Sequence, residues 1–221
     1  MFWNDEEDAL VEHQQSPVLD VIYNINGSTL PVDYHSAIAS ALIKTFDWWA
    51  DEKELSFYLM LAGEEGNGWF QEDNPQAVLY FSRRCKLVVR TPIALLDTVL
   101  SMSGLKLLVE QHEVNIIHKH NRNLSFSPTL YARHVVSNLD EMQFLETVQQ
   151  QLTDMRINCK KMLCGKSRLL NTSFGSLPTR SLMLNNLNKE DSLRLQQQGL
   201  GNYKKYGCGV FVPYKSITET G

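Results

Sequence analysis

The chain has 221 residues, 43% of them hydrophobic and 21% charged, a composition that excludes a disordered, collagen-like or coiled-coil protein. Its formal net charge of −4 at pH 7 would, taken alone, argue against a nucleic-acid partner. The charges are unevenly distributed, however. Residues 1–80 contain two Lys or Arg and 15 Asp or Glu, whereas residues 81–215 contain 19 Lys or Arg and nine Asp or Glu. The second part therefore allows a polyanionic partner, with uneven solvation of surface elements as the alternative.

Neither a membrane span nor a metal site is expected. No apolar run reaches the ~18 residues that cross a bilayer, and the start MFWNDEEDALVEH is acidic where a signal peptide would be basic. We therefore expect a cytoplasmic protein with no membrane partner. Cys85, Cys159, Cys164 and Cys208 have neither the paired spacing of a zinc site nor the density of a disulfide scaffold, so we expect free thiols.

The first half of the chain alternates between strand and helix patterns. Residues 18–25 are β-rich and end at the turn sequence Asn26-Gly27-Ser28, which predicts a strand. Residues 34–49 carry apolar side chains at spacings of three and four, with Asp33 as the cap, and predict a helix. Further strands are expected at 54–63, 77–84 and 86–92, a helix at 92–104, and a strand or hairpin at 106–117.

The same pattern then starts again. A strand is expected at 130–136 and a helix at 139–157, and strands at 179–187 and 208–214 flank a short helix at 190–198. Each half is close to βαββαβ, the order of ferredoxin-like (RRM-like) folds. The predicted fold class is therefore α+β with two tandem ferredoxin-like modules: an acidic lead at 1–17, one module at 18–120 and another at 121–221. The duplication is inferred from element order alone.

A glycine-rich segment, residues 199–209, is the most informative motif. Its glycines allow positive φ angles and a close approach of the backbone to a ligand, and Lys204 and Lys205 add positive charge. The glycines precede a strand and no Lys-Ser/Thr helix follows, which excludes the dinucleotide fingerprint and the Walker loop. A plain hairpin connection is the alternative to a ligand-binding loop. The glycines are Gly199, Gly201, Gly207 and Gly209.

This segment and the following strand, GLGNYKKYGCGVFVP, resemble the glycine-rich loop and last strand of a known family. The family is the CRISPR-associated endoribonucleases of the RAMP superfamily, the Cas-six type that cuts precursor CRISPR RNA within its repeats. Three further segments agree: LPVDYHSAIASAL at 30–42, SPTLYARHVV at 127–136 and DSLRLQQQGLG at 191–201. Together they look most like the variant of myxan-type CRISPR systems, from about residue 18 to residue 215.

The resemblance implies a basic surface that holds the repeat RNA, and cleavage that needs neither metal nor cofactor. In that reaction the ribose 2′-hydroxyl attacks the adjacent phosphate and leaves a 2′,3′-cyclic phosphate. It also implies that the protein stays on the repeat hairpin, with other subunits of a CRISPR effector complex among its partners. The family's histidine lies at or near the start of the first helix, where this chain has His35; relatives align it one position earlier, at Tyr34.

The chemistry of His35 is consistent with that role. In the first turn of a helix, free N–H groups and the positive end of the dipole attract a phosphate. Imidazole titrates near pH ~6.5, so His35 can take the 2′-hydroxyl proton or protonate the leaving 5′-oxygen. Tyr34 would bind the phosphate or orient the RNA. The alternative is a surface histidine on a helix.

Basic residues are densest at 156–168, and no Asp or Glu occurs from 155 to 189. Because phosphate contacts supply most nucleic-acid affinity, we expect this segment, together with Lys204 and Lys205, to form the RNA-holding face. A solvated basic loop is the alternative. The residues are Arg156, Lys160, Lys161, Lys166 and Arg168.

Three other histidines are weaker candidates. His118 and His120 would share one face of a strand, at a spacing compatible with a metal or a phosphate but with no acidic third ligand nearby. His134 and Arg133 would point to opposite faces, one packed and one exposed.

Two other functions remain open. One is a catalytically inactive subunit that binds the repeat RNA within a CRISPR effector or CRISPR-guided transposition complex. The other is an unrelated ferredoxin-like binding module. Cleavage of a repeat RNA would separate the enzyme from both.

Overall fold

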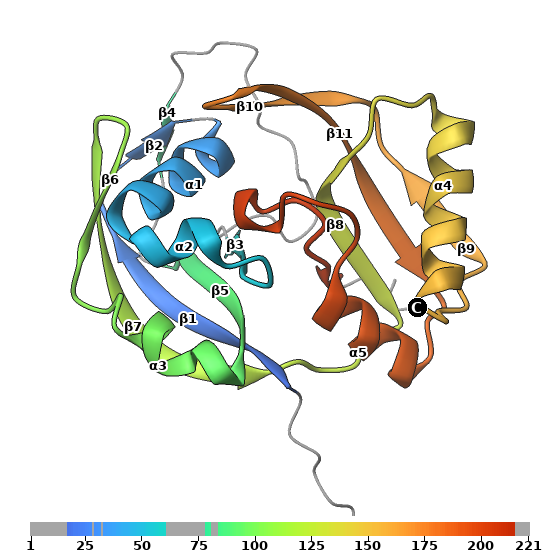
Figure 1. Ribbon diagram of the computed structural model, residues 1–221, viewed down its shortest axis with the longest axis horizontal. Helices are drawn as coiled ribbons and strands as arrows, with labels where there is room; N and C mark the ends of the chain where they lie inside the picture. Colours follow the sequence, from blue (N-terminus) through green and yellow to red (C-terminus); the bar gives the residue numbers. More distant parts are fainter. Residues whose placement is uncertain (1–16, 28, 32, 61–77, 81–83, 215–221) are drawn as a thin grey trace, which may run out of the picture.

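The computed structural model describes residues 17–27, 29–31, 33–60, 78–80 and 84–214. It shows a mixed α+β fold in which two antiparallel sheets of five strands each lie side by side (Figure 1). The first half of the chain builds one sheet and the second half builds the other. The segment that follows the last α-helix runs between them (Figure 1).

The first sheet has the strand order β3-β5-β1-β7-β6. In its central strand, neighbouring residues such as Val21 and Ile22 are both buried, so the middle of the sheet is covered on both faces. A separate two-stranded sheet pairs β2 with β4. The strands are β1 (Val18–Asn26), β2 (Thr29–Pro31), β3 (Ser56–Met60), β4 (Val78–Tyr80), β5 (Lys86–Pro92), β6 (Lys106–Val109) and β7 (His112–Asn123).

The helix predicted over 34–49 is two helices, α1 (Tyr34–Thr45) and α2 (Asp47–Asp51). They are separated at Phe46, whose backbone is extended (φ −124°, ψ 99°). The break allows both Phe46 and Trp49 to be buried in the core. The helix expected at 92–104 is also shorter, because Pro92 still belongs to β5; a 3₁₀ turn, η1 (Ile93–Leu95), leads into α3 (Leu96–Leu100).

The second sheet has the order β10-β11-β8-β12, with β9 paired to β11. Side chains cap both of its helices: Asp140 accepts from the Gln143 N–H, and Asn188 accepts from the Asp191 N–H. The strand expected at 208–214 shrinks to β12 (Val212–Pro213). The other elements are β8 (Thr129–Val136), α4 (Glu141–Asp154), β9 (Lys161–Cys164), β10 (Arg168–Thr172), β11 (Gly175–Asn185), α5 (Lys189–Gln198) and the 3₁₀ turn η2 (Lys204–Tyr206).

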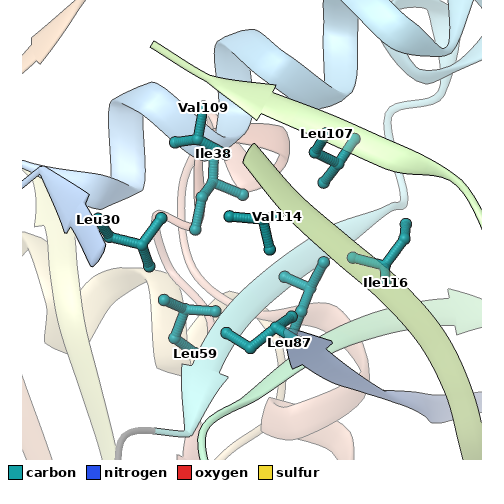
Figure 2. Close-up of a pocket in the computed structure, with 9 residues that line it drawn as sticks. Leu30, Ile38, Leu59, Leu87, Leu107, Val109, Val114 and Ile116 are labelled. Atoms are coloured by element: carbon teal, nitrogen blue, oxygen red, sulfur yellow. The ribbon is translucent and has the colours of Figure 1, made fainter. Parts of the chain in front are cut away.

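Each sheet packs against its own hydrophobic core. The first core is not built from the first half alone, because Leu170, Tyr206 and Cys208 of the second half are part of it. Figure 2 shows a cavity of about 10 Å³ in this core, lined entirely by aliphatic side chains such as Ile38 and Leu87. A space of that size holds about one water molecule, and with no polar group it is a packing defect and not a candidate site.

Within the described ranges, no helix is both long and apolar enough to span a bilayer.

Candidate functional site

The start of α1 is the first element of the site. Because α1 begins at Tyr34, His35 lies in the first helical turn, as the sequence predicts. Asp33 occupies the N-cap position, as expected, but its side chain makes no capping hydrogen bond. Its carboxylate instead accepts a hydrogen bond from the Asn171 N–H of β10 at 3.3 Å. The start of α1 is thereby attached to the second half of the chain.

The imidazole of His35 is enclosed between the two halves. It is 6% exposed, stacks on Tyr34 (ring centroids 4.6 Å apart) and meets the His134 ring edge-on at 4.7 Å. Within the described part of the chain, its Nδ1 atom is buried without a hydrogen-bond partner. Gly207 (φ +75°) lies against that nitrogen so closely that a Cβ would be 2.8 Å from it. Only glycine fits there, and the loop covers His35.

Hydrogen bonds hold the His134 ring in place. Its Nδ1 lies 3.0 Å from the Thr179 hydroxyl, which also lies 3.3 Å from the carbonyl of Arg168. When the hydroxyl donates to that carbonyl, it accepts from His134 Nδ1–H, and Nε2 keeps the lone pair of the neutral ring. His134 is packed and Arg133 is partly exposed, the arrangement expected for opposite faces; the Arg133 guanidinium lies over the Tyr34 ring at 5.6 Å.

The surroundings of both histidines favour the neutral imidazole. Burial lowers the pKa of His35 well below its usual range, and the charges of His134 and Arg133 act in the same direction. Burial, Arg133 and Arg168 lower the pKa of His134 to about 3. A neutral imidazole has one nitrogen lone pair, which is the group that accepts a proton.

These shifts predict a loss of stability in mild acid. Each histidine binds a proton more readily in the unfolded chain, so stability is full above pH ~6.5 and falls as the pH is lowered towards 3. For His134 alone the loss between pH 7 and pH 5 is about 2 kcal/mol. Urea unfolding of the wild type and His134→Gln at both pH values measures it. If the variant loses as much stability as the wild type over this interval, His134 is not the group responsible.

A buried guanidinium holds both ends of the glycine-rich loop. Arg90 of β5 donates from Nη1 to the carbonyl of Gln196 (2.9 Å), just before the loop, and to that of Phe211 (2.7 Å), just after it. Its Nε donates to Asp20 Oδ1 at 2.8 Å. This site was not predicted from the sequence. The presence of an aspartate and an arginine inside apolar strands is the pattern that could have indicated it.

The carboxylate of Asp20 is the centre of this network. It also accepts from Arg122 Nη2 (3.0 Å) and from the Tyr58 hydroxyl (2.8 Å). Burial raises the pKa of Asp20, but the charge of Arg90 and the hydrogen bonds from Arg90, Arg122 and Tyr58 outweigh it and hold the pKa below its usual range. The Asp20–Arg90 pair is therefore charged and buried, with Arg122 at its more exposed edge, and Arg90 joins the first sheet to the second half.

The loop glycines serve mainly to pack the loop on itself. The Leu200 N–H donates to the Gly209 carbonyl (3.0 Å), and the Gly209 N–H donates to the His134 carbonyl. A Cβ at Gly209 would lie 1.8 Å from the Leu200 carbonyl oxygen, and one at Gly199 would lie 2.6 Å from the Gly209 carbonyl oxygen. Gly201 alone of the four faces open space. The close approach that the sequence predicts is thus made to the protein's own backbone.

The loop lysines are only partly exposed. Lys205 Nζ donates to the Ala50 carbonyl at the end of α2 (2.8 Å). Burial lowers the pKa of Lys204, against the opposing charge of Glu54.

The basic segment is exposed but spread out. Lys161 pairs with Asn185 and Arg168 with Thr179, so the two are separated by about 20 Å along β11. Arg168 lies near enough to His134 to lower its pKa, whereas Lys161 lies at the far end of the strand. Arg168 therefore lies near His134, whereas Lys161 lies at a distance from it. All five side chains are exposed: Arg156, Lys160, Lys161, Lys166 and Arg168.

His118 and His120 do not share one face, contrary to the sequence analysis. They pair with Tyr23 and Ile22, neighbours on β1 that point to opposite faces, because the ladder shifts register between them. The described residues contain no group of three or more His, Cys, Asp or Glu placed to hold a metal ion.

Together, the fold and site define an α+β protein of two antiparallel sheets, with a histidine-bearing helix enclosed by a glycine-rich loop. The family model for Cas6 Crispr proteins matches residues 19–216, and the chain belongs to this family. The CRISPR-associated endonuclease Cas6 of Myxococcus xanthus (strain DK1622) is 23% identical over 197 residues, covering 88% of this chain and 81% of that protein.

Two solved structures show the same fold at low sequence identity. One is a CRISPR associated protein Cas6, with a TM-score of 0.56, 10% identity, and coverage of 90% of this chain and 100% of that one. The other comes from a Cas6-related gene of Pyrococcus furiosus, with a TM-score of 0.52, 11% identity, and coverage of 92% and 100%. Both likenesses concern the arrangement of elements along nearly the whole chain.

Proposed function

We propose that this protein is an endoribonuclease that cleaves precursor CRISPR RNA within the repeat, by attack of the 2′-hydroxyl and without a metal ion. The product is a mature CRISPR RNA with a 2′,3′-cyclic phosphate end, and the protein stays on the repeat hairpin. The observation that carries the proposal is the position of His35 in the first turn of α1, in ring contact with His134. Membership of the Cas6 family and the relative named an endonuclease support it.

The proposed reaction uses the start of α1. The scissile phosphate binds at the start of α1, at the positive end of the helix dipole, and His35 takes the proton from the 2′-hydroxyl as that oxygen attacks phosphorus. The bond to the 5′-oxygen breaks, and that oxygen takes the proton back from the imidazolium. Burial makes the imidazolium a strong acid, which favours this second transfer. Tyr34 stacks on the imidazole and orients it.

The same proposal covers the domain organisation. Counting β8, β9 with β10, β11 and β12 as the four strands, the second sheet has the order 2-3-1-4. The first sheet has that order too, taking β1, β3, β5 and β7. This order supports two ferredoxin-like modules, residues 18–120 and 121–221, after a lead at 1–17, of which residues 1–16 lie outside the described ranges.

The proposed RNA surface begins at Arg168 and Lys166 and continues to the exposed part of the glycine-rich loop. Arg168 is placed near His134, as described above. The residues at the start of the basic segment would contact the RNA farther from the cut. They are Arg156, Lys160 and Lys161. Other CRISPR effector subunits and a cytoplasmic location are part of the same proposal.

We expect cleavage of a labelled repeat RNA in excess EDTA at the rate measured without it. A 2′-deoxy nucleotide at the cut should stop cleavage and leave binding unchanged, because it removes only the attacking oxygen. Gel electrophoresis of the products and a filter-binding assay measure both. Loss of cleavage in EDTA, restored by a divalent metal, would contradict the metal-independent reaction.

A second candidate is the inactive subunit that binds the repeat RNA and does not cut it. The depth of His35 favours it, because the imidazole lies under Gly207 with 6% of its surface exposed. Retention of an intact all-ribose repeat RNA in the same assay would support this candidate over the enzyme.

A further inference from the structure

Three aromatic rings meet at the surface beside His35. Phe174 and Tyr203 lie almost parallel, with ring centroids 5.7 Å apart and an interplanar angle of 19°. Tyr206 meets Phe174 edge-on at 5.3 Å. Tyr206 is 7% exposed and anchors the cluster, whereas Phe174 is 53% and Tyr203 38% exposed. Two large stacked rings are therefore presented to solvent.

One of the two exposed rings stands at a position that ordinarily suits another residue. Tyr203 has φ +67°, a left-handed conformation that is unfavourable for a residue with a bulky side chain. Phe174 lies in the turn of the β10–β11 hairpin, whose last pair is Thr172 with Gly175, and it leaves a large apolar side chain in solvent. The backbone cost at Tyr203 is typical of a residue retained for function.

The rings are fixed to the elements of the proposed active site. Tyr206 directly precedes Gly207, the residue that lies against His35 Nδ1. The hairpin that carries Phe174 is attached to the start of α1 by the hydrogen bond from Asn171 to Asp33. An RNA whose phosphate binds at the start of α1 thus has its neighbouring nucleotides close to the exposed faces of these rings.

We propose that Phe174 and Tyr203 form a stacking platform for one unpaired base of the repeat RNA, close to the scissile phosphate. The proposal rests on the proposed function, because it needs RNA at the start of α1. A base suits the platform better than an apolar peptide because a cationic side chain lies next to it: Lys204 directly follows Tyr203. Stacking is tolerant of base identity, so the platform recognises an unstacked base and not a particular sequence.

Two variants remove the rings with little disturbance of the backbone. Tyr203→Asn keeps a residue that tolerates positive φ, and Phe174→Leu keeps an apolar side chain. With repeat RNA made uncleavable by a 2′-deoxy nucleotide, we expect each to raise Kd about tenfold. The slope of log Kd against log salt should stay unchanged, because no phosphate contact is lost. Tyr214→Ala is the matched control: it is also 38% exposed and in ring contact, with Tyr131 at 5.9 Å, and should bind as the wild type does.

A series of repeat RNAs, each lacking one base, identifies the partner of the platform. In the wild type, one abasic position should raise Kd about tenfold. In Tyr203→Asn, removing the base at the same position should not raise Kd further. If the wild type binds and cuts the RNA and both variants bind equally well, the platform is wrong and the proposed function stands. If the wild type neither binds nor cuts repeat RNA, the proposed function fails and the platform fails with it.

Discussion

Replacing His35 with alanine is expected to slow cleavage of repeat RNA at least 100-fold, because general acid–base catalysis contributes about 10²–10⁴ in rate. RNA affinity should change by about twofold or less, since the side chain is buried and the proposed phosphate contacts are made by the helix start and by basic side chains. Single-turnover cleavage and filter binding on the same preparation measure the two effects. Unchanged cleavage by the variant would place the active site elsewhere.

Three further variants keep this experiment interpretable. His35→Gln retains most of the volume under Gly207, so its loss of cleavage cannot be assigned to a cavity beside the loop. His120→Ala removes an exposed histidine of β7 and should cleave normally. Tyr34→Phe retains the ring that stacks on His35 and removes the hydroxyl, and it should cleave normally if Tyr34 acts by stacking alone.

Replacing Arg90 with methionine is expected to destabilise the protein by about 3–5 kcal/mol, the usual result of removing one partner from a buried ion pair. The substitution leaves Asp20 as a buried carboxylate with weaker compensation and leaves the carbonyls of Gln196 and Phe211 without this donor. For a chain of this size the melting temperature should fall by roughly 6–20 °C. Thermal unfolding followed by circular dichroism measures the shift.

Two controls separate the buried network from charge in general. Lys106→Met breaks the ion pair with Glu113, in which the side chains are 65% and 68% exposed, and should shift the melting temperature by about 1 °C or less. The double variant Arg90→Met with Asp20→Asn should be more stable than Arg90→Met alone, because no uncompensated carboxylate remains. A double variant that is less stable than either single variant would mean that the two residues do not act as a pair.

Local patterns were sufficient to predict most strands and helices, because the apolar pattern of a buried strand or an amphipathic helix lies within a few successive residues. The errors occurred where long-range packing decides the outcome. The helix over 34–49 breaks at Phe46 because Phe46 and Trp49 both have to reach the core. Similarly, His118 and His120 face opposite ways because the ladder with β1 shifts register, a shift that nothing within β7 reveals.

The candidate site was predictable only in part for the same reason. The position of His35 in the first turn follows from its own sequence neighbours. Its ring contact with His134 joins residues 99 positions apart, and the donation from Arg90 to Phe211 joins residues separated by 121 positions. Neither pair could be found without the fold, because each half contributes one partner and no local pattern couples them.

The shared core limits how the glycine-rich loop can change. Tyr206 and Cys208 are loop residues by sequence, yet both are buried in the core of the first sheet, together with Trp49 and Phe57. A substitution at either position therefore acts on folding before it acts on RNA. Adaptation to a different repeat is left to residues that face outwards without a positive φ, such as Asn202. The loop thus contains buried residues whose substitution would destabilise the fold and exposed residues whose substitution would not.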